Sequence, residues 1–212
     1  MTTHFKGKVT SMDRDLSECG DIFIRHKDEV TILEKVRSEK SFLEVYPRKP
    51  FGLPTTEKPT ASGDIRLRYN GGTGTYSSKK VKVNANLIGK WKVITSRLTV
   101  EHAGETDKNG MKRIISTLEV LKPNVVCSET YLLLAAFDTE NEAANFMAYM
   151  KTCFVRCLIA MVTATQQLAR SNFRFIPLQD FTRSWSDADL YKKYGLTDEE
   201  IKFIESTIKP MK

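Results

Sequence analysis

The sequence predicts an α+β fold: a mixed, mostly antiparallel sheet packed against one long helix, with a small helical tail at the C-terminus. Three observations support this prediction. Short apolar segments bounded by Gly, Asn and Asp fill the middle of the chain, as is typical of strands. A stripe of apolar residues at spacings of three and four follows them, and two short capped helical patterns close the sequence. A chain of 212 residues can also bury a self-sufficient apolar core.

The first third of the chain combines two short regular segments with an irregular one. Residues 21–25 indicate a short strand, and residues 28–37 indicate a helix with one apolar side. Four prolines then interrupt residues 45–63. Because proline lacks an amide donor and restricts the residue before it, this segment is predicted to be a long loop.

The middle of the chain alternates strand patterns with turns. Residues 65–69 alternate apolar and basic side chains, so Arg66 and Arg68 are expected to share the outer face of a strand. The glycine-rich residues 70–74 favour a turn, since no Gly-Lys-Ser/Thr ending of a phosphate-binding loop follows. Further strands are predicted at residues 91–95, 113–117 and 129–137. The last of these is apolar on both faces, which favours a central, covered strand.

The C-terminal part is predicted to be helical. Thr139 and Glu142 form a capping box, and the methionine-rich apolar stripe that follows predicts one helix ending near residue 169. Such a stripe could bind a partner, but core packing is the favoured interpretation. Residues 173–178 indicate an extended segment. Two helices then close the chain, at 186–194 with Gly195 as the stop, and at 197–208 with Thr197 and Glu200 as a capping box. We therefore expect one domain over residues 1–180 and a packed tail over 181–212.

Several classes of protein are disfavoured by what the sequence lacks. It has no run of about 18 apolar residues and no signal-peptide pattern at its start, so we expect a cytoplasmic protein without a membrane partner. Cys153 and Cys157 would share one helix face, but the three histidines are scattered, so buried reduced cysteines are favoured over a metal site. The common catalytic motifs of methyltransferases, ATPases, zinc hydrolases and serine hydrolases are absent.

The charge of the chain is unevenly distributed. Residues 61–130 hold 12 basic and 6 acidic side chains, whereas residues 1–60 hold 11 and 10. Most of the net charge of +7 therefore lies in the middle third, which favours a positive face for a polyanion over a solvated face without a partner. No metal ligand or catalytic residue is assigned. The candidate DNA-binding residues are Arg66, Arg68, Lys79, Lys80, Lys82, Lys90, Lys92, Arg97, Lys112 and Arg113.

Several segments, taken together, resemble the C-terminal region of N6-adenine DNA methyltransferases and bifunctional type II restriction-modification enzymes. The resemblance begins near Ile22 and continues to the end of the chain. The segments are 49–53 (KPFGL), 90–93 (KWKV), 127–131 (CSETY), 142–156 (EAANFMAYMKTCFVR), 173–181 (FRFIPLQDF), 185–187 (WSD) and 190–201 (LYKKYGLTDEEI).

The resemblance implies a target-recognition domain, similar to those of type I specificity subunits, that binds double-stranded DNA and chooses the sequence. The partner would be a methyltransferase or nuclease catalytic domain, fused or separate. S-adenosylmethionine would be held by the catalytic domain of the methyltransferase, and this chain would hold no cofactor. The departure from the family is the missing catalytic half. No base-reading motif is shared by such domains, so no specific base contact is carried over.

Two other functions remain as alternatives. A metal-dependent nuclease could use Glu200 and Lys202 as a Glu-x-Lys motif, with Asp187, Asp189 and Asp198 upstream. The motif lies in a capped helical pattern, however, where residues two positions apart point to different faces. A protein-binding subunit whose basic face meets an acidic partner is the third possibility.

Overall fold

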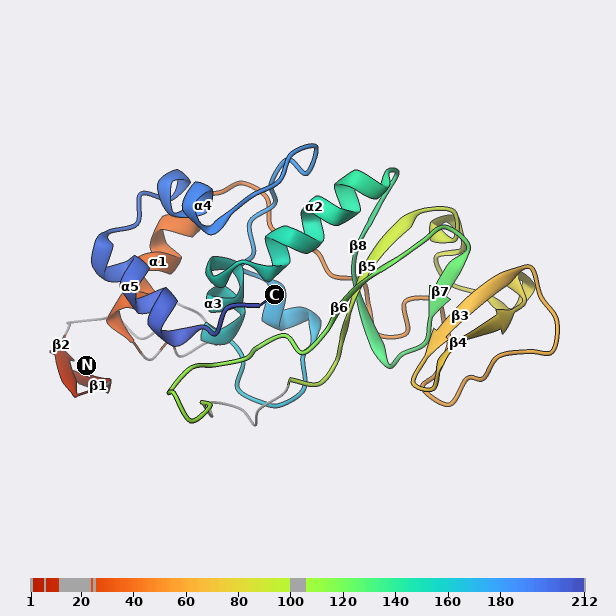
Figure 1. Cartoon of the computed structure of the whole chain (residues 1–212), viewed down its shortest axis with the longest axis horizontal. Coiled ribbons are helices and arrows are strands. Elements are labelled where there is room, and N and C mark those ends of the chain that lie inside the picture. The colour runs from red at the N-terminus through yellow and green to blue at the C-terminus, as the bar shows by residue number, and fades with distance from the viewer. Residues whose placement is uncertain (1, 6, 12–23, 25, 100–105, 212) are drawn as a thin grey trace.

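The computed structural model describes residues 2–5, 7–11, 24, 26–99 and 106–211. The protein is elongated, with helices gathered at one end, a sheet of three strands at the other, and a second sheet between them (Figure 1). This is an α+β architecture, as the sequence predicts. Within the described residues the strands form two three-stranded sheets and one N-terminal hairpin, instead of a single sheet. The hairpin pairs β1 (Thr2–Phe5) with β2 (Lys8–Ser11).

The central sheet has the strand order β6-β5-β8 and is antiparallel throughout. Its strands are β5 (Trp91–Ser96), β6 (Leu118–Leu121) and β8 (Tyr131–Phe137). The predicted strand at 129–137 is therefore present, but its predicted central place is wrong, since β5 is the middle strand. Tyr46 donates its amide to the Leu133 carbonyl at the outer edge of β8 (3.1 Å), so the 40–46 segment covers part of that edge.

The central sheet separates two apolar cores, which explains why β8 is apolar on both faces. Leu132 and Leu134 pack into the core that contains the helices, whereas Leu133 packs into the core of the strand-rich end. Neighbouring residues of a strand point to opposite faces, so an uninterrupted apolar run serves both cores. A strand such as β8 can therefore be buried on both faces even though it lies at the edge of its sheet.

The second sheet lies at the far end of the molecule and has the order β4-β3-β7. Its strands are β3 (Ile65–Tyr69), β4 (Gly72–Tyr76) and β7 (Val125–Cys127). β3 is antiparallel to β4 and parallel to β7. The proline-rich segment 45–63 contains no helix or strand, as predicted, and it places Phe51 and Leu53 in the core beneath this sheet.

Five α-helices occur in the described residues. They are α1 (Lys27–Val36), α2 (Glu140–Lys151), α3 (Cys153–Met161), α4 (Asp187–Lys193) and α5 (Asp198–Thr207). We call these helices together the helical half. The capping boxes predicted at Thr139 and Thr197 are present, and Gly195, which ends α4, has a positive φ of 57°. That left-handed conformation favours glycine at a helix C-terminus.

The single long helix predicted from residue 139 to about 169 is divided at Thr152 and ends at Met161. The Thr152 hydroxyl accepts the Val155 amide (3.2 Å) and donates to the Tyr149 carbonyl (2.7 Å), so it ends one helix and caps the next. The Asp187 carboxylate accepts the amides of Cys153 (3.0 Å) and Phe154 (2.8 Å). These bonds satisfy the free amides that a new helix start creates.

Three further expectations need correction or lie outside the described residues. The strand predicted at 113–117 does not form. Ile114 and Ile115 are both buried, so side chains do not alternate between a buried and an exposed face there. The strand β6 begins at Leu118 instead. Residues 173–178 begin with the end of a 3-10 helix (Arg170–Phe173) and then make only an isolated bridge to Phe42 through Pro177. The strand expected at 21–25 lies outside the described residues, apart from Ile24.

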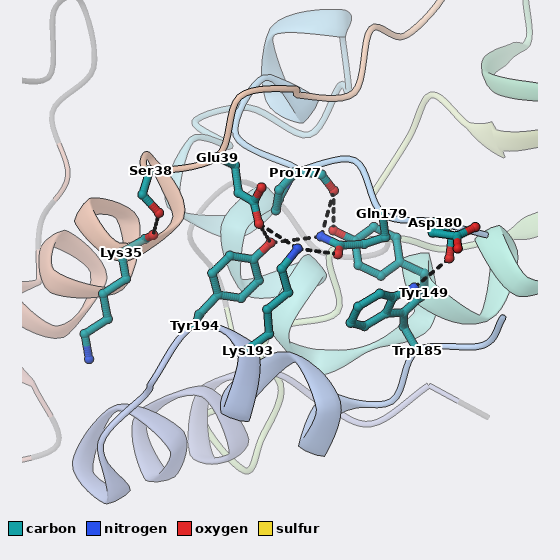
Figure 2. A network of polar contacts seen from close by, with 10 residues as sticks. All are labelled: Lys35, Ser38, Glu39, Tyr149, Pro177, Gln179, Asp180, Trp185, Lys193 and Tyr194. Atoms are coloured by element: carbon teal, nitrogen blue, oxygen red, sulfur yellow. Dashed lines mark hydrogen bonds and ion pairs between the residues drawn. The ribbon is translucent and has the colours of Figure 1, made fainter. Parts of the chain in front are cut away.

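Residues 173–181 and 190–201, which belong to the segments that carry the family resemblance, form a polar network between α1, α2 and α4 (Figure 2). Tyr194 donates to Glu39 (2.9 Å), Lys193 donates to Gln179 (2.8 Å), and Tyr149 donates to the Pro177 carbonyl (2.7 Å). The hydrogen bond from Lys193 is the main reason why the pKa of Glu39 lies below its usual value. These motif residues therefore dock the tail, which agrees with the structural interpretation favoured for them.

Candidate nucleic-acid interface

The positive charge of the chain is concentrated in residues 46–90, which we call the basic segment. It contains nine Lys and Arg residues and two Asp and Glu residues, a balance of +7 that equals the formal charge of the whole chain. The segment comprises the proline-rich loop, β3, β4 and two 3-10 helices, η1 (Ser78–Lys80) and η2 (Ala85–Leu87). It therefore occupies the strand-rich end of the molecule, away from the helical half (Figure 1).

Three lysines follow directly after β4 and are exposed: Lys79, Lys80 and Lys82. The buried ring of Tyr76 holds the start of this stretch, with the Lys80 ammonium 5.5 Å from the ring centroid. Asp64, the residue just before β3, accepts the Ser78 hydroxyl (2.6 Å) and amide (2.8 Å), which anchors η1 to the start of β3. The lysines thus extend from a fixed backbone.

The two arginines of β3 differ in their surroundings. Arg66 is exposed, and one of its terminal nitrogens donates to the Thr73 carbonyl (3.3 Å). Arg68 is held by Glu119 (2.8 Å) and lies over the ring of Tyr131 at 4.8 Å from its centroid. Of the two arginines, Arg66 is exposed, whereas Arg68 is half-buried.

Lys90 and Lys92 lie at the start of the central sheet and are less available. Lys90 pairs with Asp138, the residue just before the α2 cap. Lys92 is fully buried, and its ammonium donates to the carbonyls of Leu87 (3.0 Å), Ile88 (2.9 Å) and Lys90 (2.7 Å). Burial lowers the pKa of Lys92 to about 8. Because the Lys92 ammonium is buried and donates to the backbone carbonyls of the turn after η2, it is not part of the candidate interface.

Arg97 belongs to a charge cluster that the sequence did not predict. Glu129 is 3% exposed, and its carboxylate pairs with Arg97 (3.4 Å). Arg48 and Lys49 from the proline-rich loop pair with the same carboxylate. Three cations around one carboxylate leave a local excess of two positive charges. Glu129 therefore brings together basic side chains from two segments that are far apart in the sequence.

Lys112 and Arg113 lie apart from this region. Lys112 donates its backbone amide to the Thr207 carbonyl (2.7 Å) and forms an isolated bridge with Ile208, which places both residues beside the end of α5. The ten candidates therefore do not form one face. Arg66, Lys79, Lys80 and Lys82 are the exposed members at the strand-rich end, and Arg48, Lys49 and Lys58 join them. The excess of basic over acidic residues in the proline-rich segment 45–63 could have identified Arg48, Lys49 and Lys58 from the sequence.

The segments that carry these residues are held together by hydrogen bonds and a cation–π contact. Asn84 donates its side-chain amide to the Pro50 carbonyl (2.7 Å), so the stretch after η1 touches the loop that bears Arg48 and Lys49. Thr60 donates its amide to the Thr75 carbonyl (2.8 Å), so residues 58–60 follow the outer edge of β4. Lys58 lies over the Tyr69 ring at 5.5 Å. The basic segment is therefore one packed unit.

Two of the carboxylates considered for a nuclease, Glu200 and Asp187, have structural roles in the helical half. Glu200 is buried, accepts the hydroxyl of Thr31 (2.7 Å) and pairs with Lys35 (2.6 Å). Burial alone would raise the pKa of Glu200, but these hydrogen bonds and that of the Thr197 amide lower it below its usual value. Asp187 caps α3. Among the described residues, no group of three or more His, Cys, Asp and Glu side chains is placed to hold a metal ion.

No protein-family model matches this chain, and no curated protein matches it either. Within the part of the chain that the structure describes, no helix is both long and apolar enough to cross a membrane.

Proposed function

We propose that this chain is a DNA-recognition module that serves an adenine-specific DNA methyltransferase or restriction-modification enzyme and has no catalytic role itself. The main support is the basic segment, which carries a charge of +7 on one end of the molecule. Its exposed lysines and arginines extend from strands and anchored turns. A surface of this kind suits the phosphate backbone of a duplex, where phosphate contacts supply affinity.

The resemblance supports the choice of DNA over other polyanions, because the similar regions are target-recognition domains. In this proposal the transferred methyl group and S-adenosylmethionine belong to a methyltransferase domain that is fused to this chain or lies on a separate one. The C-terminal tail packs within the helical half, and the basic segment is the surface that contacts DNA. The nuclease alternative gains no support from a specific contact, since Glu200 and Asp187 stabilise helices.

Binding to duplex DNA should decrease steeply as salt is added. If four to six phosphates are contacted, the slope of log affinity against log salt should lie near −4 to −5. Fluorescence anisotropy with a labelled random-sequence duplex, titrated at several salt concentrations, measures this slope. A slope near zero would show that the basic segment does not contact phosphates. An absence of binding even at low salt would instead favour the protein-binding alternative.

A further inference from the structure

The turn at residues 49–52 holds Lys49 in an unusual backbone conformation. Its φ is 58°, in the left-handed region that residues with a side chain rarely adopt. The Gly52 amide donates to the Lys49 carbonyl (2.8 Å), and Pro50 and Phe51 are buried, so packing of the turn maintains this conformation. Glycine would be less strained at this position. A strained backbone that the surrounding structure maintains is typical of functional sites, which indicates a role for the Lys49 side chain.

The Lys49 ammonium belongs to a cluster of three cations around Glu129, together with Arg48 and Arg97. The carboxylate lies beneath the cations: its side chain is 4% exposed, whereas those of Arg48 and Lys49 are 71% and 49% exposed. Arg97 is more covered, at 24%. Three positive charges and one negative charge leave an excess of two positive charges. The cluster therefore presents cations to solvent, which suits an anion.

Most hydrogen-bond donors of the cluster are unused within the described residues. Arg48 donates its Nε to Glu129 and makes no other side-chain hydrogen bond there, so its two terminal nitrogens remain available. The Lys49 ammonium lies 3.7 Å from the nearest carboxylate oxygen, beyond hydrogen-bond distance. The bond from Arg97 to Glu129 is long, at 3.4 Å. Guanidinium and ammonium groups with free donors are the usual partners of phosphate oxygens in proteins.

The cluster adjoins the exposed lysines that follow β4. Asn84 donates its side-chain amide to the Pro50 carbonyl (2.7 Å) in the turn that carries Lys49. Gly52 packs against Val83, since a Cβ added at this glycine would lie 3.3 Å from the Val83 Cγ2. Lys82 directly precedes these two contact residues in the sequence. The cluster and the lysines after β4 therefore lie on touching segments, which allows one duplex to contact both.

We infer that Arg48, Lys49 and Arg97 together bind one phosphate of the DNA backbone. This inference rests on the proposed DNA binding and adds a defined phosphate site within the basic segment and the end of β5. A backbone phosphate carries one negative charge, which the local excess of two positive charges attracts. Phosphates are the same in every sequence, so this site supplies affinity and leaves the choice of sequence to other residues.

The first test is Lys49→Gly, which removes the cation and suits the left-handed backbone. It should weaken duplex binding about fivefold, equally for duplexes of different sequence. Thermal unfolding should occur at about the wild-type temperature, because the relieved strain offsets the greater freedom of glycine in the unfolded chain. Lys49→Arg keeps the charge and should bind as the wild type does. Asn124→Gly is the matched control: Asn124 also has a positive φ (64°) but no charge, so duplex affinity should not change.

The second test asks whether one phosphate is shared. The double variant Arg48→Ala/Lys49→Gly leaves Arg97 to pair with Glu129. Loss of a single phosphate contact should reduce the steepness of the salt dependence by about one. A reduction of about two would mean that Arg48 and Lys49 contact separate phosphates, and the shared site would be wrong. Fluorescence anisotropy with labelled duplexes at several salt concentrations measures both the affinities and the slopes.

The remaining outcomes distinguish the inference from the proposed function. If Lys49→Gly keeps the wild-type affinity, or if Lys49→Arg binds as weakly as Lys49→Gly, the inference is wrong, although DNA binding by other residues stands. Calorimetry with inorganic phosphate tests a free ion as the ligand. Phosphate binding that Lys49→Gly abolishes without any change in DNA affinity would overturn the inference. If the wild-type chain shows no salt-sensitive binding to any duplex, both the inference and the proposed function are wrong.

Discussion

Replacing Asp187 by alanine should destabilise the protein by about 3 kcal/mol. The Asp187 carboxylate accepts two amides at the start of α3, and both amides would be left without an acceptor next to an apolar core. The substitution also removes a negative charge from the positive end of that helix. Urea unfolding followed by circular dichroism would measure the loss of free energy.

Asp198→Ala is the matched control, because Asp198 is the first residue of α5 just as Asp187 is the first residue of α4. Asp198 is exposed, so its removal should cost only about 0.5 kcal/mol through the helix dipole. Equal losses for the two variants would contradict the role given to Asp187. That result would mean that α2 and α3 are separated mainly by Thr152.

Reversing the charge of Lys79, Lys80 and Lys82 together to glutamate should weaken duplex DNA binding at least tenfold, or about 1.4 kcal/mol. The three side chains are exposed and carry part of the uncompensated charge of the basic segment. The salt dependence of the remaining affinity should also become shallower, because fewer phosphates are neutralised. Anisotropy titrations of the same labelled duplex across several salt concentrations measure both effects.

The matched control for this variant is a triple reversal at Lys27, Lys192 and Lys202, which are exposed lysines of α1, α4 and α5. It changes the net charge equally but leaves the basic segment intact, so the affinity should stay within about threefold of wild type. Lys193 is unsuitable for this control because it pairs with Glu39 (2.6 Å) and supports the tail. A greater loss in the control than in the first variant would place the DNA face on the helical half.

The elements predicted well from sequence are those determined by local signals. The strand at 65–69, the capping boxes at Thr139 and Thr197, and the stop at Gly195 all depend on residues within a few positions of one another. In each case the spacing of apolar residues or a capping side chain is enough to specify the structure. The proline-rich loop is predictable for the same reason.

The errors arose where a distant residue decides the local structure. The apolar stripe continues across Thr152, but the helix is interrupted there because Asp187, far along the chain, supplies a cap for a second helix start. The order of the strands is equally non-local. An apolar run such as that of β8 is compatible with a central strand or with an edge strand between two cores, and only tertiary packing separates these cases.

The candidate site was predictable only in part. An excess of basic residues in a segment can be counted from the sequence, whereas the exposure of each side chain depends on the fold. The block of basic residues indicated the strand-rich end, and Lys79, Lys80 and Lys82 are exposed there. The sequence could not show that Lys92 points inward to three carbonyl groups. Nor could it show that Glu129 gathers basic side chains from distant segments.

The position of the DNA face is tested most directly by hydrogen–deuterium exchange of the intact chain with and without duplex DNA. If the basic segment is the DNA face, bound DNA should slow amide exchange in peptides from residues 46–60 and 72–90. Peptides that cover α4 and α5 should exchange at the same rate in both states. Slower exchange confined to α4 and α5, with no change in residues 46–90, would contradict the proposed interface.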